Sequence, residues 1–574
     1  MDPGHSVGVA LTPDLALASR TAVVVAAALA VALTVALDRL AGRDRGPGLR
    51  RRLLLGVPWG TLTTAGVVLA VYLFVQGGWS HWNAPVVVPF RAWTYLAPLG
   101  VAVSPFAHAG PGHLLGNLFG TLAVAPVVEY AVGHFPRRRG ASSFGAARDD
   151  PFVRAFLLFP GAAVAVGLCS GAFALGPVIG FSGVVFAFVG AALIYYPLGT
   201  VVVLSASGLV STVYRALSDP VVVASGRPAY VTPWWADVAI QGHALGLLLG
   251  VLAAAWLAAA RGDALPRPRR LAAGALLVAA EQALWAVYWF RGGETFVLYR
   301  GVGVALVALA AVPVAALAVD RDAPAVDSVR EALRALTPRR ASVAVLLVVL
   351  ASLSGPALFV NLAAVNDAPL PGDPVAVRGY GVAYAEDVEN GMVSVVDVDA
   401  FGESTSVDTS GVVVRNPDRG VWTTAVSKGR LAFAGRQRVV VGGVGWREVV
   451  VVERRGWTTV GDDAPAYRVT LAHDGETRLA FLSNASTAEP RVAGRNVSVV
   501  PTESGFELLV KGGNESVRAP IPGENETVAA NGLRLERDGR AVFALADEGN
   551  ASTGDVAGTR VRVATEERYG GGGG

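Results

Sequence analysis

The sequence predicts a polytopic α-helical membrane protein that ends in an extracytoplasmic all-β domain. Of its 574 residues, 53% are hydrophobic and only 16% are charged, whereas soluble domains carry about 25% charged residues. The apolar residues are concentrated before residue 364, in runs long enough to cross a membrane. The segment after residue 363 is polar and alternates apolar with polar side chains, which is typical of strands. This composition excludes a wholly soluble protein.

The charged residues divide at the same position. Residues 364–574 hold 22 of the 48 basic and 29 of the 45 acidic residues, so the formal charge is about +10 before the boundary and about −7 after it. The sequence has no basic stripe with interleaved aromatic residues, and we therefore expect no nucleic-acid partner. The single cysteine, Cys169, excludes an intramolecular disulfide framework and a cysteine-based metal site.

About ten apolar runs approach the ~20 residues that a helix needs to cross the hydrocarbon core. The fifth and sixth runs are separated only by residues 197–199, but we expect each run to form its own transmembrane helix. The runs cover residues 21–39, 53–76, 112–134, 153–172, 181–198, 200–216, 238–260, 271–291, 297–319 and 342–363.

Arginine clusters in short loops predict the orientation, because such clusters stay on the cytoplasmic side. They follow the first, third and seventh runs and precede the tenth, at residues 43–52, 137–139, 261–270 and 339–340. This alternation agrees with ten crossings, an N-terminus outside the cell and an exported segment after residue 363. We therefore predict a multi-pass protein of the cell membrane.

The exported segment carries its own signals. Alternating stretches at residues 439–441, 447–452 and 457–460, separated by glycine-rich turns, predict antiparallel strands. About 200 residues suffice for one or two sandwich-like units. The sequence contains Asn-x-Ser/Thr sequons only in this segment, which supports export and predicts a glycoprotein. The sequon residues are Asn484, Asn496, Asn514, Asn525 and Asn550.

Polar side chains are expensive at membrane depth, so the few within the apolar runs indicate candidate sites. His113 and Asn117 are four residues apart and share a helical face. Ser182 opens the fifth run, and His243 lies near the start of the seventh. At about 1.5 Å per residue, Asn117, Ser182 and His243 each lie about 25 Å from the inner end of their run. We expect these side chains to meet in one layer below the outer surface.

These residue types suit acyl-transfer chemistry. Ser182 can attack a carbonyl carbon if His243 removes its proton. His113 and Asn117 can then donate hydrogen bonds to the oxyanion that forms. Asp237 lies at the boundary of a run, where a solvated end or a helix-capping role is expected, and we do not assign it to the site.

Small residues would let the helices that carry Ser182 and His243 approach closely. Each polar or small residue alone is more often a packing or structural residue of a membrane helix, so the prediction depends on their combination at one depth. The small residues are Gly183 and Gly190 in the fifth run and Gly246 and Gly250 in the seventh.

Three motifs occur in order on the second, fourth and sixth of six consecutive runs. They are His108-x4-His113-x3-Asn117, Gly180-Phe181-Ser182-Gly183 and His243-x2-Gly246-x3-Gly250. The ordered set resembles the rhomboid intramembrane serine proteases, with a rhomboid-like six-helix core at residues 53–262. One span with a basic loop, residues 1–52, precedes this core. Three further spans, residues 263–363, and the β-rich domain, residues 364–574, follow it.

The resemblance implies a serine endopeptidase with a dyad of Ser182 and His243 that needs no aspartate, metal or organic cofactor. Ser182 would be the nucleophile, and His243 would act as general base and then as general acid. The oxyanion hole would consist of His113, Asn117 and the backbone N–H of Ser182. The substrates would be transmembrane proteins that enter laterally from the lipid bilayer and are cut near its outer face.

The same resemblance assigns supporting roles. Phe186 occupies the place of an aromatic residue that packs on the catalytic imidazole, and the alternative is simple core packing. His108 resembles a histidine that bonds the loop between the first two core helices. Glu129 matches an acidic residue with a structural role. The remaining supporting residues belong to the motifs and are Gly180, Phe181, Gly183, Gly246 and Gly250.

Other features depart from the family pattern. The first outer loop lacks the family's Trp-Arg pair and instead offers Trp79, His81, Trp82, Arg91 and Trp93. The extra spans and the β-rich domain are candidates for recruiting or positioning substrate, for binding an extracytoplasmic partner, or for an unrelated purpose. Two alternative functions stay open: a rhomboid-like pseudoprotease that binds or chaperones membrane proteins, and a transporter. The spans lack acidic or basic residues suited to an ion path, which disfavours the transporter.

Overall fold

The computed structural model divides the chain into two compact units. The helical unit comprises Met1–Gly226, Trp234–Trp289 and Leu298–Leu362, and the β unit comprises Arg227–Pro233, Phe290–Val297 and Ala363–Gly574. Two short segments before residue 363 therefore belong to the β unit. The structure describes residues 17–29, 48–135, 149–218, 230–319, 337–362, 370–391, 407–546 and 560–570, apart from residues 19, 27, 237, 293 and 463.

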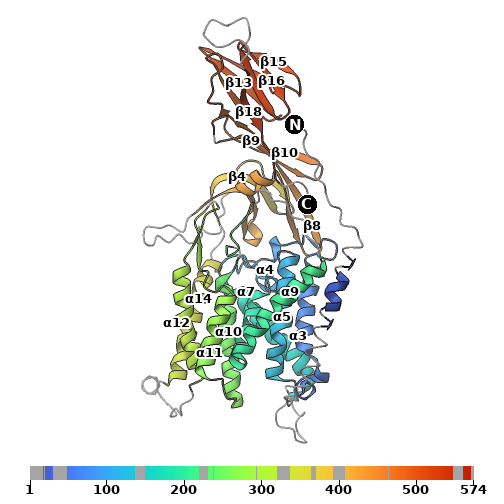
Figure 1. Ribbon diagram of the computed structural model, residues 1–574, viewed down its shortest axis with the longest axis vertical. Coiled ribbons are helices and arrows are strands. Elements are labelled where there is room, and N and C mark those ends of the chain that lie inside the picture. Colours follow the sequence, from blue (N-terminus) through green and yellow to red (C-terminus); the bar gives the residue numbers. More distant parts are fainter. Residues whose placement is uncertain are drawn as a thin grey trace. The chain divides into compact units, whose positions relative to one another are not determined.

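The helical unit is a bundle of roughly parallel and antiparallel helices (Figure 1). Two π-helical turns, Val71–Val75 and Arg154–Leu158, extend α3 and lead into α7. The helices are α2 (Leu49–Arg52), α3 (Trp59–Ala70), α4 (Pro98–Val103), α5 (Pro111–Val132), α6 (Pro151–Val153), α7 (Phe159–Phe173), α8 (Ser182–Tyr195), α9 (Pro197–Ser218), α10 (Ile240–Arg261), α11 (Pro268–Glu281), α12 (Arg300–Ala316) and α14 (Pro338–Leu362).

This bundle confirms the prediction of a polytopic α-helical membrane protein. Within the described residues, five helical stretches are long and apolar enough to cross a membrane: Pro111–Val132, Pro151–Phe173, Pro197–Ser218, Ile240–Arg261 and Pro338–Leu362. Three shorter apolar helices accompany them at Trp59–Val75, Ser182–Tyr195 and Arg300–Ala316. The first predicted span, residues 21–39, lies largely outside the described residues.

The eighth predicted span, residues 271–291, is wrong in its second half. Helix α11 ends at Glu281, and the chain then turns at Ala283, whose φ of 53° a helix does not allow. Strand β1 (Tyr288–Phe290) follows and pairs with β2 (Phe296–Leu298). Residues 271–291 are mostly apolar, but a run of apolar residues does not by itself distinguish one long helix from a helix followed by a hairpin.

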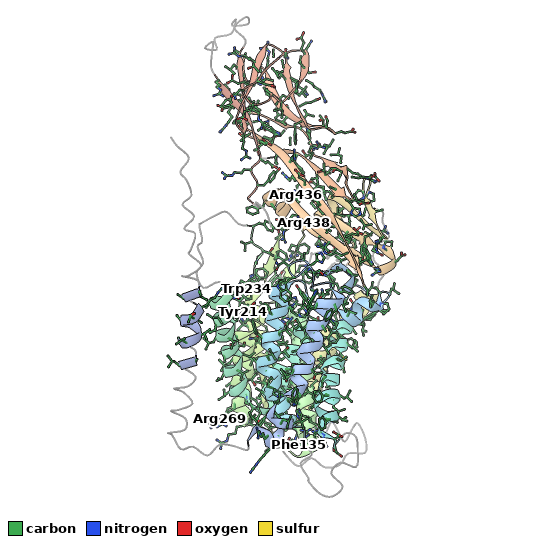
Figure 2. The ribbon with its side chains drawn as sticks, turned by 90° about the vertical axis from the view of Figure 1, so that its right-hand side faces the viewer. Phe135, Tyr214, Trp234, Arg269, Arg436 and Arg438 are labelled. Carbon is green, nitrogen blue, oxygen red and sulfur yellow. The ribbon has the colours of Figure 1, made fainter. Side chains whose placement is uncertain are left out.

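The two ends of the bundle can be followed in Figure 2. Phe135, just after α5, lies at the same end as Arg269, in the first turn of α11. Tyr214, near the end of α9, and Trp234 lie at the opposite end. The C-terminus of α5 and the N-terminus of α11 therefore lie at the same end of the bundle, as the predicted alternation of crossings requires.

Helix α8 is the central helix of the bundle. It has 14 residues, so it is about 21 Å long and shorter than a ~30 Å hydrocarbon core. Eleven of these residues are buried against neighbouring helices. Its side chains form the middle of the main apolar cluster, with Val124 of α5, Leu248 and Val251 of α10 and Leu271 of α11. Ser182, the first residue of α8, stands at the partly exposed start of this buried helix.

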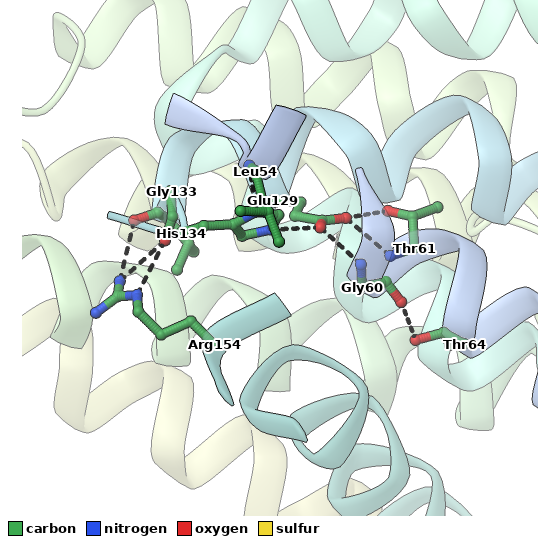
Figure 3. Close-up of polar contacts among 9 residues, drawn as sticks. Leu54, Gly60, Thr61, Thr64, Glu129, Gly133, His134 and Arg154 are labelled. Atoms are coloured by element: carbon green, nitrogen blue, oxygen red, sulfur yellow. Dashed lines mark hydrogen bonds and ion pairs between the residues drawn. The ribbon is translucent and has the colours of Figure 1, made fainter. Parts of the chain in front are cut away.

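A buried carboxylate ties the start of α3 to the end of α5 (Figure 3). Glu129 accepts hydrogen bonds from the backbone N–H groups of Gly60 (2.7 Å) and Thr61 (2.8 Å) and from the Thr61 hydroxyl (2.7 Å). His134 Nδ1 accepts from the Leu54 N–H at 2.9 Å, so its proton is on Nε2. That Nε2–H donates to Glu129 at 2.6 Å. Glu129 thus caps the N-terminus of α3, whose first N–H groups have no acceptor within the helix.

Among the described residues after 369, antiparallel strands form three sheets, which confirms a β-rich C-terminal region. One sheet of four strands contains β3 (Val375–Val377), β4 (Tyr380–Glu389), β5 (Asp408–Asn416) and β6 (Val421–Ser427). The eight-stranded sheet contains β7 (Arg436–Gly443), β8 (Trp446–Thr459), β9 (Ala466–His473), β10 (Glu476–Leu482), β15 (Thr527–Ala530), β16 (Leu533–Asp538), β17 (Ala541–Ala546) and β18 (Val561–Glu566). The other four-stranded sheet contains β11 (Ser486–Thr487), β12 (Asn496–Pro501), β13 (Phe506–Gly512) and β14 (Glu515–Pro520), and helix α15 (Lys428–Ala434) connects β6 to β7.

Strand β8 pairs with three other strands of the eight-stranded sheet. Its first part pairs with β7 and β9, and its last residues pair with β18. The predicted stretches 447–452 and 457–460 are therefore not separated by a turn, because Gly456 continues the strand and its carbonyl accepts the N–H of Glu567 at 2.8 Å. A side chain at Gly456 would overlap the Glu567 carboxylate. The glycine thus permits a close contact within a strand and does not mark a turn.

A buried ion pair lies beside this glycine. The Arg454 guanidinium, 3% exposed, donates to both carboxylate oxygens of Glu567, at 2.8 and 3.2 Å. It also lies over the ring of Tyr467, 3.7 Å from the centroid. Burial opposes the charged form, but the hydrogen bonds and the charge of Glu567 outweigh it and raise the pKa of Arg454. Removing one partner would leave a buried charge unpaired.

The sequons can be placed on this fold. Asn484, Asn514 and Asn525 are exposed and lie outside the strands, and Asn496 is the first residue of β12. Asn550 lies outside the described residues. Glycosylation stays a prediction.

We expect Glu129→Gln to destabilise the helical unit by about 1–3 kcal/mol, because an amide NH2 would face N–H donors and leave at least one of them without an acceptor. The unfolding midpoint of the full-length protein in detergent measures this effect. Glu281→Gln is the matched control, since Glu281 is exposed and accepts from the Ser205 hydroxyl at 3.1 Å. Equal losses in the two variants would contradict the capping role.

Candidate active site

The predicted nucleophile and base meet where two helices begin. Ser182 is the first residue of α8, and His243 lies in the first turn of α10. The distance from Ser182 Oγ to His243 Nε2 is 2.9 Å, which is hydrogen-bond distance. Residues 61 positions apart in the sequence are therefore in direct contact.

Glycines bring the backbones of α8 and α10 together. A Cβ atom at Gly246 would overlap the carbonyl oxygen of Gly183, and one at Gly250 would overlap that of Ala187. From the other side, a Cβ atom at Gly190 would overlap the carbonyl oxygen of Leu247. The expected close approach exists, although Gly190 and Gly250 contact residues other than each other.

The imidazole of His243 is oriented by an aromatic ring. Phe186 lies one turn after Ser182 and stacks on the His243 ring, with 4.2 Å between centroids and 13° between planes. His243 Nδ1 is buried and has no hydrogen-bond partner in the part of the chain that the structure describes. Asp237, which the sequence analysis left out of the site, lies outside the described residues. The ring is thus held by stacking and by Ser182.

A second group of polar residues lies beside the start of α8. Asn117 is 8% exposed, and its Nδ2 lies 3.0 Å from His108 Nε2. The Phe181 N–H donates more weakly to the same nitrogen, at 3.5 Å. The ring of His113 packs edge-on against that of His108, with 5.0 Å between centroids. Because His108 Nε2 accepts one N–H of the Asn117 amide, the second N–H remains available for another acceptor.

Gly180 links this group to Ser182. Its φ of 126° is one that residues with a side chain rarely adopt. A Cβ atom there would lie 2.5 Å from His113 Cε1 and 3.6 Å from Asn117 Nδ2. The glycine therefore serves both the backbone turn before α8 and the close contact with these side chains. Phe181, the next residue, is 1% exposed and packs near Phe106.

The arrangement can stabilise negative charge next to Ser182. The first N–H groups of a helix have no acceptors within the helix and carry the positive end of its dipole. Those of Ser182 and Gly183 lie in the first turn of α8, and His113 and Asn117 approach Gly180, two residues before Ser182. Among the described residues, no group of three or more His, Cys, Asp or Glu side chains is placed to hold a metal ion.

Sequence reasoning missed a buried glutamine that holds the His108 loop. Gln76, fully buried, donates from Nε2 to the carbonyls of Val86 (2.9 Å) and His108 (2.8 Å). Its Oε1 accepts the N–H of His108 at 2.7 Å. An amide at the very end of an apolar run was the available signal, because a buried amide there must have partners.

The segment between α3 and α5, which the sequence predicts to be the first outer loop, is also bonded to the segment before Ser182. Arg91 donates to the carbonyl of Pro177 at 3.0 Å, and the N–H of Ala92 donates to that of Val178 at 3.0 Å. Trp93 Nε1 donates to the Val88 carbonyl within the loop at 2.6 Å. The loop therefore supports the turn that presents Ser182.

Comparison with known families identifies this part of the chain. Residues 91–260 match the family model described as Rhomboid domain. The chain carries a Rhomboid domain. No curated protein and no solved structure matches the chain. The Rhomboid domain match extends from Arg91, in the segment between α3 and α5, to the last turn of α10 and includes His108, His113, Asn117, Ser182 and His243. It confirms the resemblance at the level of the family, and it leaves α3, α11, α12, α14 and the β unit outside the match.

We expect Gly250→Ala to lower the stability of the Rhomboid domain by about 1–3 kcal/mol, because the added methyl group would push α10 away from the Ala187 carbonyl. Gly161→Ala in α7 is the matched control, since no atom lies within 4 Å of the added Cβ. That variant should be neutral or more stable by up to about 1 kcal/mol. Unfolding midpoints of the full-length variants measure the difference, and equal midpoints would contradict the close packing of α8 and α10.

Proposed function

We propose that the protein is an intramembrane serine endopeptidase that cleaves transmembrane protein segments near the outer face of the membrane. The observation that carries this proposal is the 2.9 Å contact between Ser182 Oγ and His243 Nε2 inside a Rhomboid domain. The multi-pass helical bundle supports a site that substrates reach from the lipid bilayer. The cell membrane as location, and the outer position of both the N-terminus and the β unit, belong to the same proposal.

The dyad accounts for acylation. His243 Nε2 takes the proton of Ser182 Oγ while this oxygen bonds to the carbonyl carbon of the scissile peptide. The carbonyl oxygen becomes an oxyanion, which Asn117, His113 and the N–H groups at the start of α8 stabilise. His243 then gives the proton to the leaving amine as the C–N bond breaks. Water attacks the acyl-enzyme by the same route and regenerates Ser182.

His108 acts through Asn117. It accepts one N–H of the Asn117 amide and thereby turns the other toward the place of the oxyanion. Gln76 holds His108 in turn through three hydrogen bonds with its loop. Donors held in this way need no reorganisation when charge develops.

Substrate choice follows from membrane physics. A transmembrane helix satisfies its own backbone groups, so a scissile bond becomes accessible only where the helix unwinds. Substrates with helix-destabilising residues and small side chains at the cleaved bond should therefore be preferred. Ser182 and His243 both lie at the start of a helix and hence near one end of the bundle. A substrate helix would therefore have to unwind near that end to reach them.

Cleavage of a model transmembrane substrate by the purified full-length protein in proteoliposomes tests this proposal. Ser182→Ala and His243→Ala should each reduce the turnover rate by at least about 10³-fold, because neither dyad residue has a substitute. The controls are Ser207→Ala, whose hydroxyl bonds only locally to the Leu204 carbonyl, and His81→Ala in the outer loop. Both controls should keep normal turnover.

A serine-directed fluorophosphonate provides a second readout that needs no substrate. Labelling that Ser182→Ala abolishes would agree with a nucleophilic serine. Absence of both labelling and cleavage in the unmodified protein would reject the protease and favour a rhomboid-like protein that binds membrane clients.

We expect Asn117→Ala to lower kcat by about 10²-fold with little change in KM, because an oxyanion donor acts mainly in the transition state. Steady-state kinetics with the model substrate separate the two constants. A change confined to KM would contradict the role of Asn117 in the oxyanion hole.

A further inference from the structure

Helix α14 lies outside the Rhomboid domain match but is hydrogen-bonded to both segments that lead into the dyad. It begins 78 residues after the match ends, at Pro338. We propose that α14 is a positioning helix for the dyad and that Gln241 and Asn361 are the positioning residues that connect it. This inference rests on the proposed function, because it assigns α14 a role in that reaction.

Both the NH2 group and the oxygen of the Gln241 side-chain amide are hydrogen-bonded, and these bonds connect α10 with α7 and α14. It lies in the first turn of α10, two residues before His243. Its Nε2 donates to the carbonyl of Phe173 at the end of α7 (3.0 Å) and to that of Leu353 in α14 (2.8 Å). Its Oε1 accepts the N–H of Leu175 at 3.0 Å. The start of α10 is thereby bonded both to α14 and to the chain that continues from α7 toward Ser182.

One acceptor of Gln241 lies at a helix end, and the other lies next to a helical position that a proline disturbs. Phe173 is the last residue of α7, where carbonyls lack partners within the helix. In α14, Pro356 has no N–H and leaves the carbonyl of Ser352, four residues earlier, without its helical partner. The neighbouring Leu353 carbonyl accepts the Gln241 amide, which its two lone pairs allow beside a helical hydrogen bond.

Asn361 makes the second connection, at the end of α14. Its side chain is 3% exposed and donates from Nδ2 to the carbonyl of Ala174 at 3.0 Å. Its backbone carbonyl accepts the N–H of Tyr95 in the first outer loop at 2.9 Å. The Tyr95 hydroxyl donates to the carbonyl of Ala172, so the same stretch of chain is held twice. This stretch continues through Gly180 to Ser182.

Helix α14 is therefore hydrogen-bonded both to the start of α10, which carries His243, and to the segment that leads from α7 to Ser182. Catalytic groups lose function when they move by about 0.5–1 Å. His243 is especially dependent on the position of α10, because its Nδ1 has no partner within the described residues that could orient the ring.

The alternative is that the Gln241 and Asn361 contacts only stabilise the fold. The two roles differ in what they change. A stabilising contact affects the unfolding midpoint and leaves turnover unchanged at temperatures well below it. A positioning contact affects kcat and the rate at which Ser182 reacts with a small probe, whereas KM for the substrate stays the same.

Kinetics of Gln241→Met in full-length protein, reconstituted in proteoliposomes, test the positioning role. We expect kcat and the rate of fluorophosphonate labelling to fall by about 10-fold to 100-fold, with KM within about 2-fold of the unmodified protein. Asn361→Leu should lower the same quantities. The double variant should lose less than the product of the two single losses, because both act through α14.

Ser342→Ala is the matched control within α14. Ser342 is buried, and its hydroxyl donates to the Pro338 carbonyl at 2.7 Å, away from the two connections. This variant should keep normal kcat and labelling. Asn361→Leu keeps the test decisive if Gln241→Met does not fold, since it replaces one buried side chain by an apolar one of similar size.

The outcomes separate this inference from the proposed function. Turnover that depends on Ser182 together with normal kcat in the Gln241 or Asn361 variants would overturn the positioning role alone. A lowered unfolding midpoint with unchanged kcat would also overturn it. Turnover that does not depend on Ser182, or no turnover at all in the unmodified protein, would overturn both.

Discussion

The close contact between the backbones of α8 and α10 is the constraint on which the site depends. At Gly246 and Gly250 a single methyl group would overlap a carbonyl oxygen of α8. Only at this separation can the short side chain of Ser182 reach His243. The same contact makes α8 the buried centre of the bundle, so a helix shorter than the membrane core is surrounded by protein, while Ser182 at its start stays partly exposed.

Buried amide and carboxyl side chains hold the loops and helix ends of the helical unit, whose backbone groups are not paired by regular secondary structure. Glu129 caps α3, and Gln76 holds the His108 loop. Gln241 and Asn361 connect α14 to the ends of α7 and α10. Each group lies near the start or end of a helix and bonds backbone groups of a neighbouring segment, which need partners in an apolar surrounding. In a protein with few polar side chains at membrane depth, such groups determine how the loops near the site are arranged.

The β unit follows a different principle. Its strands are held by a long shared strand, β8, and by the buried pair of Arg454 and Glu567 at the point where that strand changes partners. Sequence alternation predicted strands separated by glycine-rich turns, but the stretches 447–452 and 457–460 belong to one strand, in which Gly456 permits a close contact. At Gly456 the deciding contact is with Glu567, far away in the sequence. At residues 282–291 the apolar composition concealed a local turn and hairpin.

The sequence by itself determined the class of the protein, its division near residue 363 and the residues of the candidate site. It could do so because hydrophobic runs, charge and spaced His, Asn, Ser and Gly residues are local properties. It also indicated one layer for Asn117, Ser182 and His243, since helical rise converts position into depth. Only the tertiary structure decided which groups touch: Phe186 on His243, His108 on Asn117, and Gln241 on α14. Those contacts depend on how helices pack against one another, and no local pattern in a single sequence specifies that packing.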